Sequence, residues 1–190
     1  MQISQPRVKP RNPRARIPRK VLIWQYGSNM DEDRLNSPGR LDGSAKFVGL
    51  ALKRGYRVAF THTNNEGIGT SDIIESNPTD FVIGVLYKIP EAKLPKLRSI
   101  EGVNSGAHKE VANFKLTKLD HQLNETNQVV QVITYIVVRK ERNPPTNSEY
   151  ANHILKGIRD HKMGTEYFDK IKTIILENNP IIKNELIIYY

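Results

Sequence analysis

The tetrapeptide Tyr26-Gly27-Ser28-Asn29 is the stretch of this sequence whose residue types best suit chemistry. An apolar, β-prone run (21–25) precedes it, and an acidic run that favours a helix start (30–35) follows it. A tight loop between a strand and a helix points successive main-chain N–H groups into one small space, and glycine lets a ligand approach without meeting a Cβ atom. Such a loop can bind a carboxylate or a developing oxyanion. An ordinary turn, with Asn29 or Asp31 as helix cap, is the alternative interpretation.

Further motifs follow this loop in a fixed order, and together they make the sequence similar to the gamma-glutamylcyclotransferase family. They are Gly84-Val85-Leu86-Tyr87, then Ile100-Glu101-Gly102-Val103 with Ser105-Gly106, then Asn143-Pro144-Pro145 with Tyr150. The resemblance covers residues 21–177. The loop combined with the downstream glutamate is a more specific signal than either motif alone.

The resemblance implies an enzyme of the lyase or acyltransferase type that releases 5-oxoproline and a free amine from a γ-glutamyl amide, without a cofactor. The α-amine of the substrate attacks its own δ-carbonyl, so the enzyme must remove a proton from the α-ammonium, stabilise an oxyanion and protonate the leaving nitrogen. We expect γ-glutamyl amino acids to be preferred over other γ-glutamyl amines, with glutathione, the substrate of a separate branch, as a nearby alternative. A catalytically silent binding module of the same fold is the alternative from a different functional class.

The family's functional residues carry over to matching positions. Glu101 matches the catalytic glutamate, and to act as base and then as acid it should be partly desolvated with a raised pKa. A surface glutamate at a helix C-terminus is the alternative. The expected substrate-binding residues are Ile23, Trp24, Gln25, Tyr26, Gly27, Ser28 and Tyr150. Tyr150 resembles the tyrosine that closes over the ligand, although it could equally be a packing residue at a helix start.

One position departs from the family pattern. His108 stands two residues after Gly106, where well-known members carry tyrosine, so specificity for the leaving amine could differ. His108 could also supply an extra acid–base group, but an isolated histidine at a strand start is usually a half-exposed residue. The remaining histidines show no ligand-like spacing, and we therefore expect no metal site. They are His62, His121, His153 and His161.

Composition restricts the compartment and the partners. The sequence has no cysteine, which excludes disulfides and thiolate chemistry, and a cytoplasmic location is favoured. There is no apolar run long enough for a membrane span and no signal-peptide pattern. The net charge is +9, of which the Pro-rich segment 1–20 carries +7, leaving +2 on the body. We expect a disordered tail that binds nucleic acid non-specifically at most, and a body that is a monomer or homodimer.

The elements that would position these residues follow from periodicity and turn signals. We expect short helices at 31–36 and 90–100 and longer amphipathic helices at 148–161 and 166–176. Strands are expected at 46–52 and 56–61, joined by a turn, at 70–75 and 81–89, and in a hairpin of 108–119 with 129–138. The apolar segment 181–190 should pack on the body as a strand or cover a partner.

About six strands with interspersed helices and no regular βαβ alternation indicate an α+β fold. The family resemblance implies a small closed mixed β-barrel surrounded by short helices. We expect one domain over residues 21–190, preceded by the tail of residues 1–20, because a chain of this length buries one sizeable core.

Overall fold

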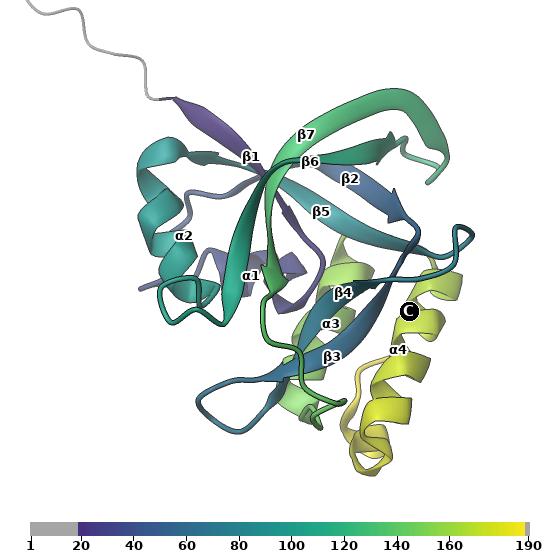
Figure 1. Ribbon diagram of the computed structural model, residues 1–190. Helices are drawn as coiled ribbons and strands as arrows, with labels where there is room; N and C mark the ends of the chain where they lie inside the picture. Colours follow the sequence, from purple (N-terminus) through teal and green to yellow (C-terminus); the bar gives the residue numbers. More distant parts are fainter. Residues whose placement is uncertain (1–18, 189–190) are drawn as a thin grey trace, which may run out of the picture.

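The computed structural model describes residues 19–188 and consists of a closed barrel with a helical layer beside it (Figure 1). The strands are β1 (Lys20–Gln25), β2 (Lys46–Arg54), β3 (Tyr56–Thr63), β4 (Gly69–Glu75), β5 (Phe81–Pro90), β6 (His108–Leu119) and β7 (Glu125–Val137). The α-helices are α1 (Glu32–Leu35), α2 (Leu94–Ile100), α3 (Ser148–Asp160) and α4 (Thr165–Asn178). Three 3-10 helices are η1 (Ser28–Met30), η2 (Glu91–Lys93) and η3 (Pro180–Glu185).

Five strands form the barrel in the order β1-β5-β2-β6-β7. All neighbouring pairs in this order are antiparallel, and the parallel pairing of β1 with β7, at Ile23 opposite Ile133, closes the sheet. The predicted α+β fold with a small closed mixed β-barrel and helices outside it is therefore confirmed.

The two predicted strands joined by a turn at Gly55 are present, but they belong to different sheets. The chain does turn at Gly55, whose φ is +75°, a value that glycine adopts readily. However, β2 pairs with β5 and β6 in the barrel, whereas β3 pairs with β4 in a separate two-stranded sheet. The turn thus sends the chain from one sheet to another, and strand periodicity alone cannot tell this from a hairpin.

The barrel core is built around Trp24, which is fully buried. Its indole N–H donates to the Ala51 carbonyl oxygen at 3.2 Å, and its ring stacks on Phe114 with centroids 6.0 Å apart. A Cβ atom on Gly84 would lie 2.4 Å from the indole nitrogen, so this glycine allows a close approach of β5 to the tryptophan.

The helical layer lies below the barrel, where α3 and α4 flank the β3–β4 sheet (Figure 1). The apolar face of α3 buries Ile154, Leu155 and Ile158, and Gly157 packs against Met30 of η1. The C-terminal segment forms η3 rather than the predicted strand, and its residues Ile182 and Leu186 are buried. The predicted packing of this segment on the body is therefore confirmed, although its predicted strand geometry is not.

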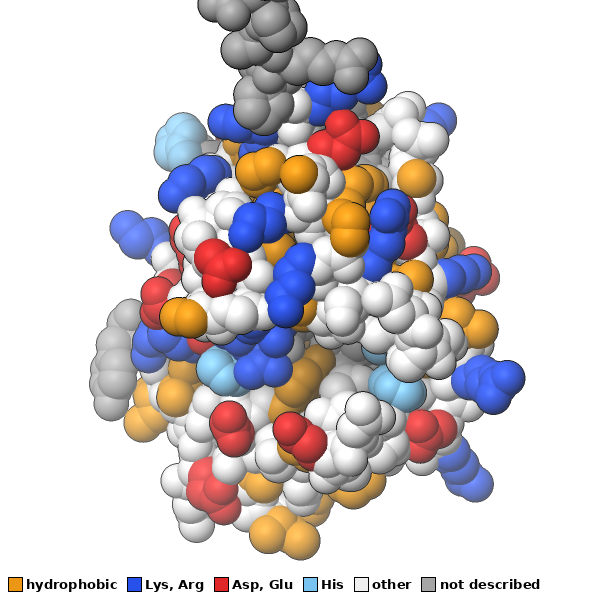
Figure 2. Space-filling model, turned by 90° about the vertical axis from the view of Figure 1, so that its left-hand side faces the viewer, with side chains coloured by type: hydrophobic (Ala, Val, Ile, Leu, Met, Phe, Trp, Pro, Cys, Tyr) orange, Lys and Arg blue, Asp and Glu red, His pale blue; other side chains and the backbone are white. Residues whose placement is uncertain are grey.

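The first described strand, β1, begins at Lys20. The predicted disordered tail falls mostly on residues 1–18, outside the described residues. Over one face of the molecule, Lys and Arg side chains are interspersed with Asp and Glu side chains (Figure 2). No helix in the described part of the chain is long and apolar enough to cross a membrane.

Candidate functional site

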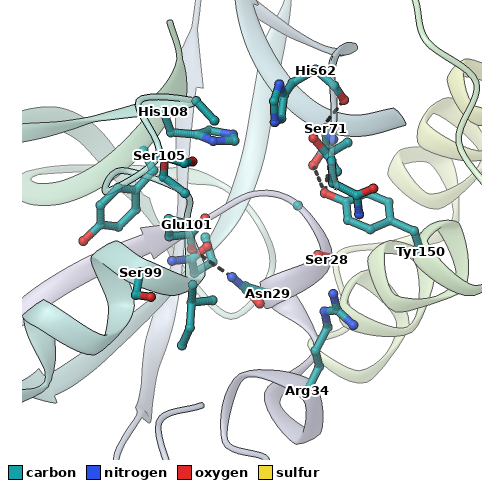
Figure 3. A pocket seen from close by; sticks show the side chains of 18 of the residues that line it. Ser28, Asn29, Arg34, His62, Ser71, Ser99, Glu101, Ser105, His108 and Tyr150 are labelled. Atoms are coloured by element: carbon teal, nitrogen blue, oxygen red, sulfur yellow. Dashed lines mark hydrogen bonds between the residues drawn. The ribbon is translucent and has the colours of Figure 1, made fainter. Parts of the chain in front are cut away.

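A cavity of about 390 Å³ lies between the end of β1, the loop after α2, the β3–β4 sheet and the start of α3 (Figure 3). Its walls are mainly polar and carry both signs of charge. The residues that line it and enter the argument below are Gln25, Tyr26, Gly27, Ser28, Asn29, Arg34, Arg40, His62, Ser71, Glu101, Ser105, His108 and Tyr150.

Glu101 lies in this cavity because α2 ends beside it. The Glu101 N–H donates to the Leu97 carbonyl oxygen at 2.9 Å, and Gly102, with φ +68°, then turns the chain away from the helix. One carboxylate oxygen accepts a 2.8 Å hydrogen bond from Asn29 Nδ2. Burial raises the pKa of Glu101, although the amide of Asn29 and the positive charge of Arg40 oppose this effect. A carboxylate in this environment can accept and return a proton nearer to neutral pH than a free one.

Asn29 joins the carboxylate to a guanidinium. Its Nδ2 donates to Glu101, while its Oδ1 accepts a 2.6 Å hydrogen bond from Arg40, which fixes the orientation of the amide. The turn that carries Arg40 is held by Asn36, whose side chain makes paired hydrogen bonds with the Ala45 main chain. Asn29 therefore positions Glu101 as well as supporting the loop.

The loop of Tyr26, Gly27 and Ser28 forms one wall of the cavity. The N–H groups of Gly27 and Ser28 donate to no acceptor among residues 19–188, so they remain available to an oxyanion or a carboxylate. The Tyr26 hydroxyl, by contrast, donates to the Tyr135 carbonyl oxygen at 2.5 Å, and burial raises the pKa of this phenol. The Tyr26 side chain thus anchors the loop to β7.

Packing also requires glycine at position 27, and the sequence interpretation did not predict this requirement. A Cβ atom there would lie 2.2 Å from Ser71 Oγ. Ser71, on β4, makes two contacts with the Tyr150 hydroxyl, its N–H donating at 3.1 Å and its Oγ lying at 3.0 Å. The space beside Gly27 is therefore filled by the Ser71–Tyr150 pair, and Tyr150, at the start of α3, is held over the cavity.

The three strand residues before the loop divide into two groups. Gln25 lines the cavity at 5% exposure, and its buried Nε2 has no hydrogen-bond partner among the described residues. Ile23 and Trp24 are fully buried in the barrel and do not line the cavity. The side chains of these two residues support the strand, and any contact they make with a ligand would have to be indirect.

His108 and His62 stand together at another side of the cavity, with ring centroids 5.3 Å apart (Figure 3). Burial, with the neighbouring His62, lowers the pKa of His108 to about 4. The His108 ring is therefore neutral at pH 7 and a weaker base than free imidazole. Among residues 19–188, no group of three or more His, Asp or Glu side chains is arranged to hold a metal ion.

Sequence reasoning missed Arg34, Arg40, His62 and Ser71 as cavity residues. Both arginines follow the loop closely in sequence, Arg34 on α1 and Arg40 on the next turn, but the direction of their side chains is set by folding and has no local signature. Ser71 and His62 come from a sheet whose position beside the barrel is set by tertiary packing, so no local pattern indicates them.

Comparisons with known proteins give a consistent set of similarities. A sequence model of the AIG2-like family matches residues 81–171. Human gamma-glutamylcyclotransferase is 26% identical over 160 residues, which cover 80% of this chain and 78% of the human protein. The putative gamma-glutamylcyclotransferase YkqA of Bacillus subtilis (strain 168) is 27% identical over 152 residues, which cover 80% of this chain and 51% of YkqA. A solved structure of a gamma-glutamyl cyclotransferase superposes with a TM-score of 0.67 at 23% identity, covering 87% of this chain and 99% of the other.

Proposed function

The chain belongs to the AIG2-like and gamma-glutamylcyclotransferase family, and from this premise we propose that it cyclises γ-glutamyl amides, releasing 5-oxoproline and a free amine. One observation carries the proposal. A partly buried carboxylate, Glu101, shares a polar cavity with the main-chain N–H groups of Gly27 and Ser28, which have no acceptor among residues 19–188. These are the groups that proton transfer and oxyanion stabilisation require.

In the proposed reaction, Glu101 accepts a proton from the α-ammonium of the substrate. The freed amine attacks the δ-carbonyl carbon, a C–N bond forms, and the loop N–H groups stabilise the oxyanion. Glu101 returns its proton to the leaving nitrogen as the oxyanion collapses, and the original amide C–N bond breaks. The ring nitrogen still carries two hydrogens after the attack, so it loses one of them to Glu101 and becomes the lactam N–H, and Glu101 passes this proton to the released amine, which leaves as an ammonium. The cavity holds the γ-glutamyl chain folded back on itself, which lowers the entropic part of the barrier.

The test is the Glu101→Gln variant. Glutamine keeps the size and the hydrogen bond from Asn29 but cannot accept the proton, so 5-oxoproline release should fall by about 10²–10⁴-fold or more. Calorimetric binding of 5-oxoproline should persist, because the loop is unchanged. Glu91→Gln is the matched control, since Glu91 is exposed and lies outside the cavity, and it should behave as wild type.

Activity of Glu101→Gln within about tenfold of wild type, with an unchanged melting curve, would show that another group carries the proton. Binding of γ-glutamyl compounds by the wild type without any 5-oxoproline release would instead indicate a non-catalytic binding module. The substrates for both measurements are γ-glutamyl dipeptides, glutathione and γ-glutamyl-lysine. These substrates differ in the leaving amine, and His108, which replaces the family tyrosine in the cavity, can change the preference for that amine.

A further inference from the structure

Two arginines of the cavity have no carboxylate partner among residues 19–188. Arg34, on α1, and Arg40, on the following turn, are both half-buried, and the Nε of each is buried without a hydrogen-bond partner. Among residues 19–188, neither forms an ion pair with a carboxylate, and the Arg34 side chain makes no hydrogen bond. Arg34 and Arg40 both line the cavity, and burial together with the positive charge of Arg34 lowers the pKa of Arg40.

Two like charges in a half-buried position are unfavourable unless an anion neutralises them. Glu101 lies nearby, but its carboxylate is separated from Arg40 by the Asn29 amide and forms no ion pair with either arginine. Guanidinium groups match carboxylates well, because their N–H donors form parallel hydrogen bonds to both oxygens. The arginine pair (Arg34 and Arg40) is therefore preorganised for a carboxylate that residues 19–188 do not supply.

A γ-glutamyl amino acid has two carboxylates, the α-carboxylate of the glutamyl group and that of the leaving amino acid. The position of the arginine pair indicates which of them it binds. The α-amine and the α-carboxylate are attached to the same carbon atom, so the proton acceptor and the carboxylate site must be neighbours. In the structure, a single amide side chain, Asn29, spans from Glu101 to Arg40 through hydrogen bonds of 2.8 and 2.6 Å. The carboxylate of a leaving amino acid lies beyond the bond that breaks, and Figure 3 shows the two histidines at the top of the cavity and Arg34 at the bottom, apart from each other.

Building on the proposed function, we propose that Arg34 and Arg40 bind the α-carboxylate of the γ-glutamyl group. The main-chain N–H groups of Gly27 and Ser28 then face the δ-carbonyl oxygen, and the leaving amine points toward His62 and His108. This orientation has a consequence for catalysis. The bound carboxylate offsets the positive charge that lowers the pKa of Glu101, which makes Glu101 a stronger base once substrate is in place.

The experiment measures whether removing an arginine and removing the ligand carboxylate have coupled effects on binding affinity. Calorimetry compares 5-oxoproline with its carboxamide, which differs only at the former α-carboxylate, on wild type, Arg34→Gln and Arg40→Gln. Wild type should bind the acid about 10–100-fold more tightly than the amide, the range expected for hydrogen bonds to a charged group. Each variant should lose most of this preference by weakening the acid alone. Arg34→Gln is the cleaner variant because Arg40 also contacts Asn29.

The control variant is Arg57→Gln, which removes the same charge from an exposed position on β3 outside the cavity and should keep the preference. A second ligand pair, γ-glutamyl-alanine and γ-glutamyl-ethylamide, differs in the leaving-group carboxylate. The assignment would be overturned if Arg34→Gln changed the preference between these two ligands. It would also be overturned if the wild type showed no preference for 5-oxoproline over its carboxamide. Release of 5-oxoproline by the wild type is measured in parallel, so a protein that shows the coupling but no turnover would refute the proposed reaction and not the carboxylate site.

Discussion

Single residues of the site are constrained by contacts that leave almost no free space. Gly27 is the clearest case, because its hydrogen atom faces the Ser71 hydroxyl, which in turn contacts the Tyr150 hydroxyl. The loop, the β3–β4 sheet and α3 therefore meet at one glycine. A side chain of any size at this position must displace the serine.

We predict that Gly27→Ala lowers both stability and activity. The new Cβ would lie 2.2 Å from Ser71 Oγ, and moving the serine breaks its contact with Tyr150. Overpacking of this kind destabilises by about 1–3 kcal/mol, measured by urea unfolding. Ser71→Ala removes the clashing atom, so the double variant Gly27→Ala/Ser71→Ala should recover part of the loss. Additive effects of the two substitutions would contradict the predicted contact.

Sequence reasoning at this scale found the residues that are adjacent in the chain and missed those brought together by folding. Tyr26, Gly27 and Ser28 line the cavity and were assigned through the family resemblance, because a strand, a glycine and a helix start in succession also fit an ordinary turn. The arginine pair could not be identified from the sequence, because its significance depends on the absence of a partner carboxylate within the part of the chain that the structure describes. That absence is a property of the folded structure.

At the scale of elements, helix α3 holds the segment that follows the Tyr26–Asn29 loop. Asp31, at 2% exposure, caps α1 through the Asp33 N–H and accepts hydrogen bonds from His153 at 2.7 Å and Lys156 at 2.8 Å, both on α3. Burial alone would raise the pKa of Asp31, but the hydrogen bonds from Lys156 and His153 outweigh it and lower the pKa. Periodicity predicted both helices closely, whereas the polar contact between them had no sequence signature.

We predict that Asp31→Asn destabilises the protein by about 1–3 kcal/mol at neutral pH, because a buried charged acceptor is lost. A carboxylate with a lowered folded-state pKa contributes stability that is present above its unfolded pKa, near 3.8, and is lost as pH falls through the folded pKa. The difference between wild type and variant should therefore shrink below pH 4. Asp33→Asn is the matched control, since Asp33 also contacts Lys156 but is 85% exposed, and it should change little. A pH-independent difference would contradict the ionic interpretation.

At the scale of the whole molecule, closure depends on contacts between distant parts of the chain. The parallel pairing of β1 with β7 closes the barrel, and the Thr134 hydroxyl donates to the Trp24 carbonyl oxygen at 3.1 Å across the same seam. Strand order of this kind cannot be derived from local pattern, and the barrel was predictable only through the family resemblance. The segment after α4 likewise packs back onto α3, through a hydrogen bond from Asn152 Nδ2 to the Glu185 carbonyl oxygen at 2.8 Å.

We predict that deleting residues 181–190 destabilises the fold. The deletion removes Ile182 and Leu186, which are 6% and 7% exposed, together with both hydrogen bonds between Asn152 and the segment. Each buried aliphatic side chain contributes about 1.5–3 kcal/mol, so the loss should be about 3 kcal/mol or more by urea unfolding. Ile181→Ser is the matched control, because Ile181 is 86% exposed and its replacement should leave the midpoint nearly unchanged. A truncated protein with the wild-type urea midpoint would mean that the segment does not support α3, and that the position of Tyr150 over the cavity depends on the Ser71 contact and the Asn147 cap alone.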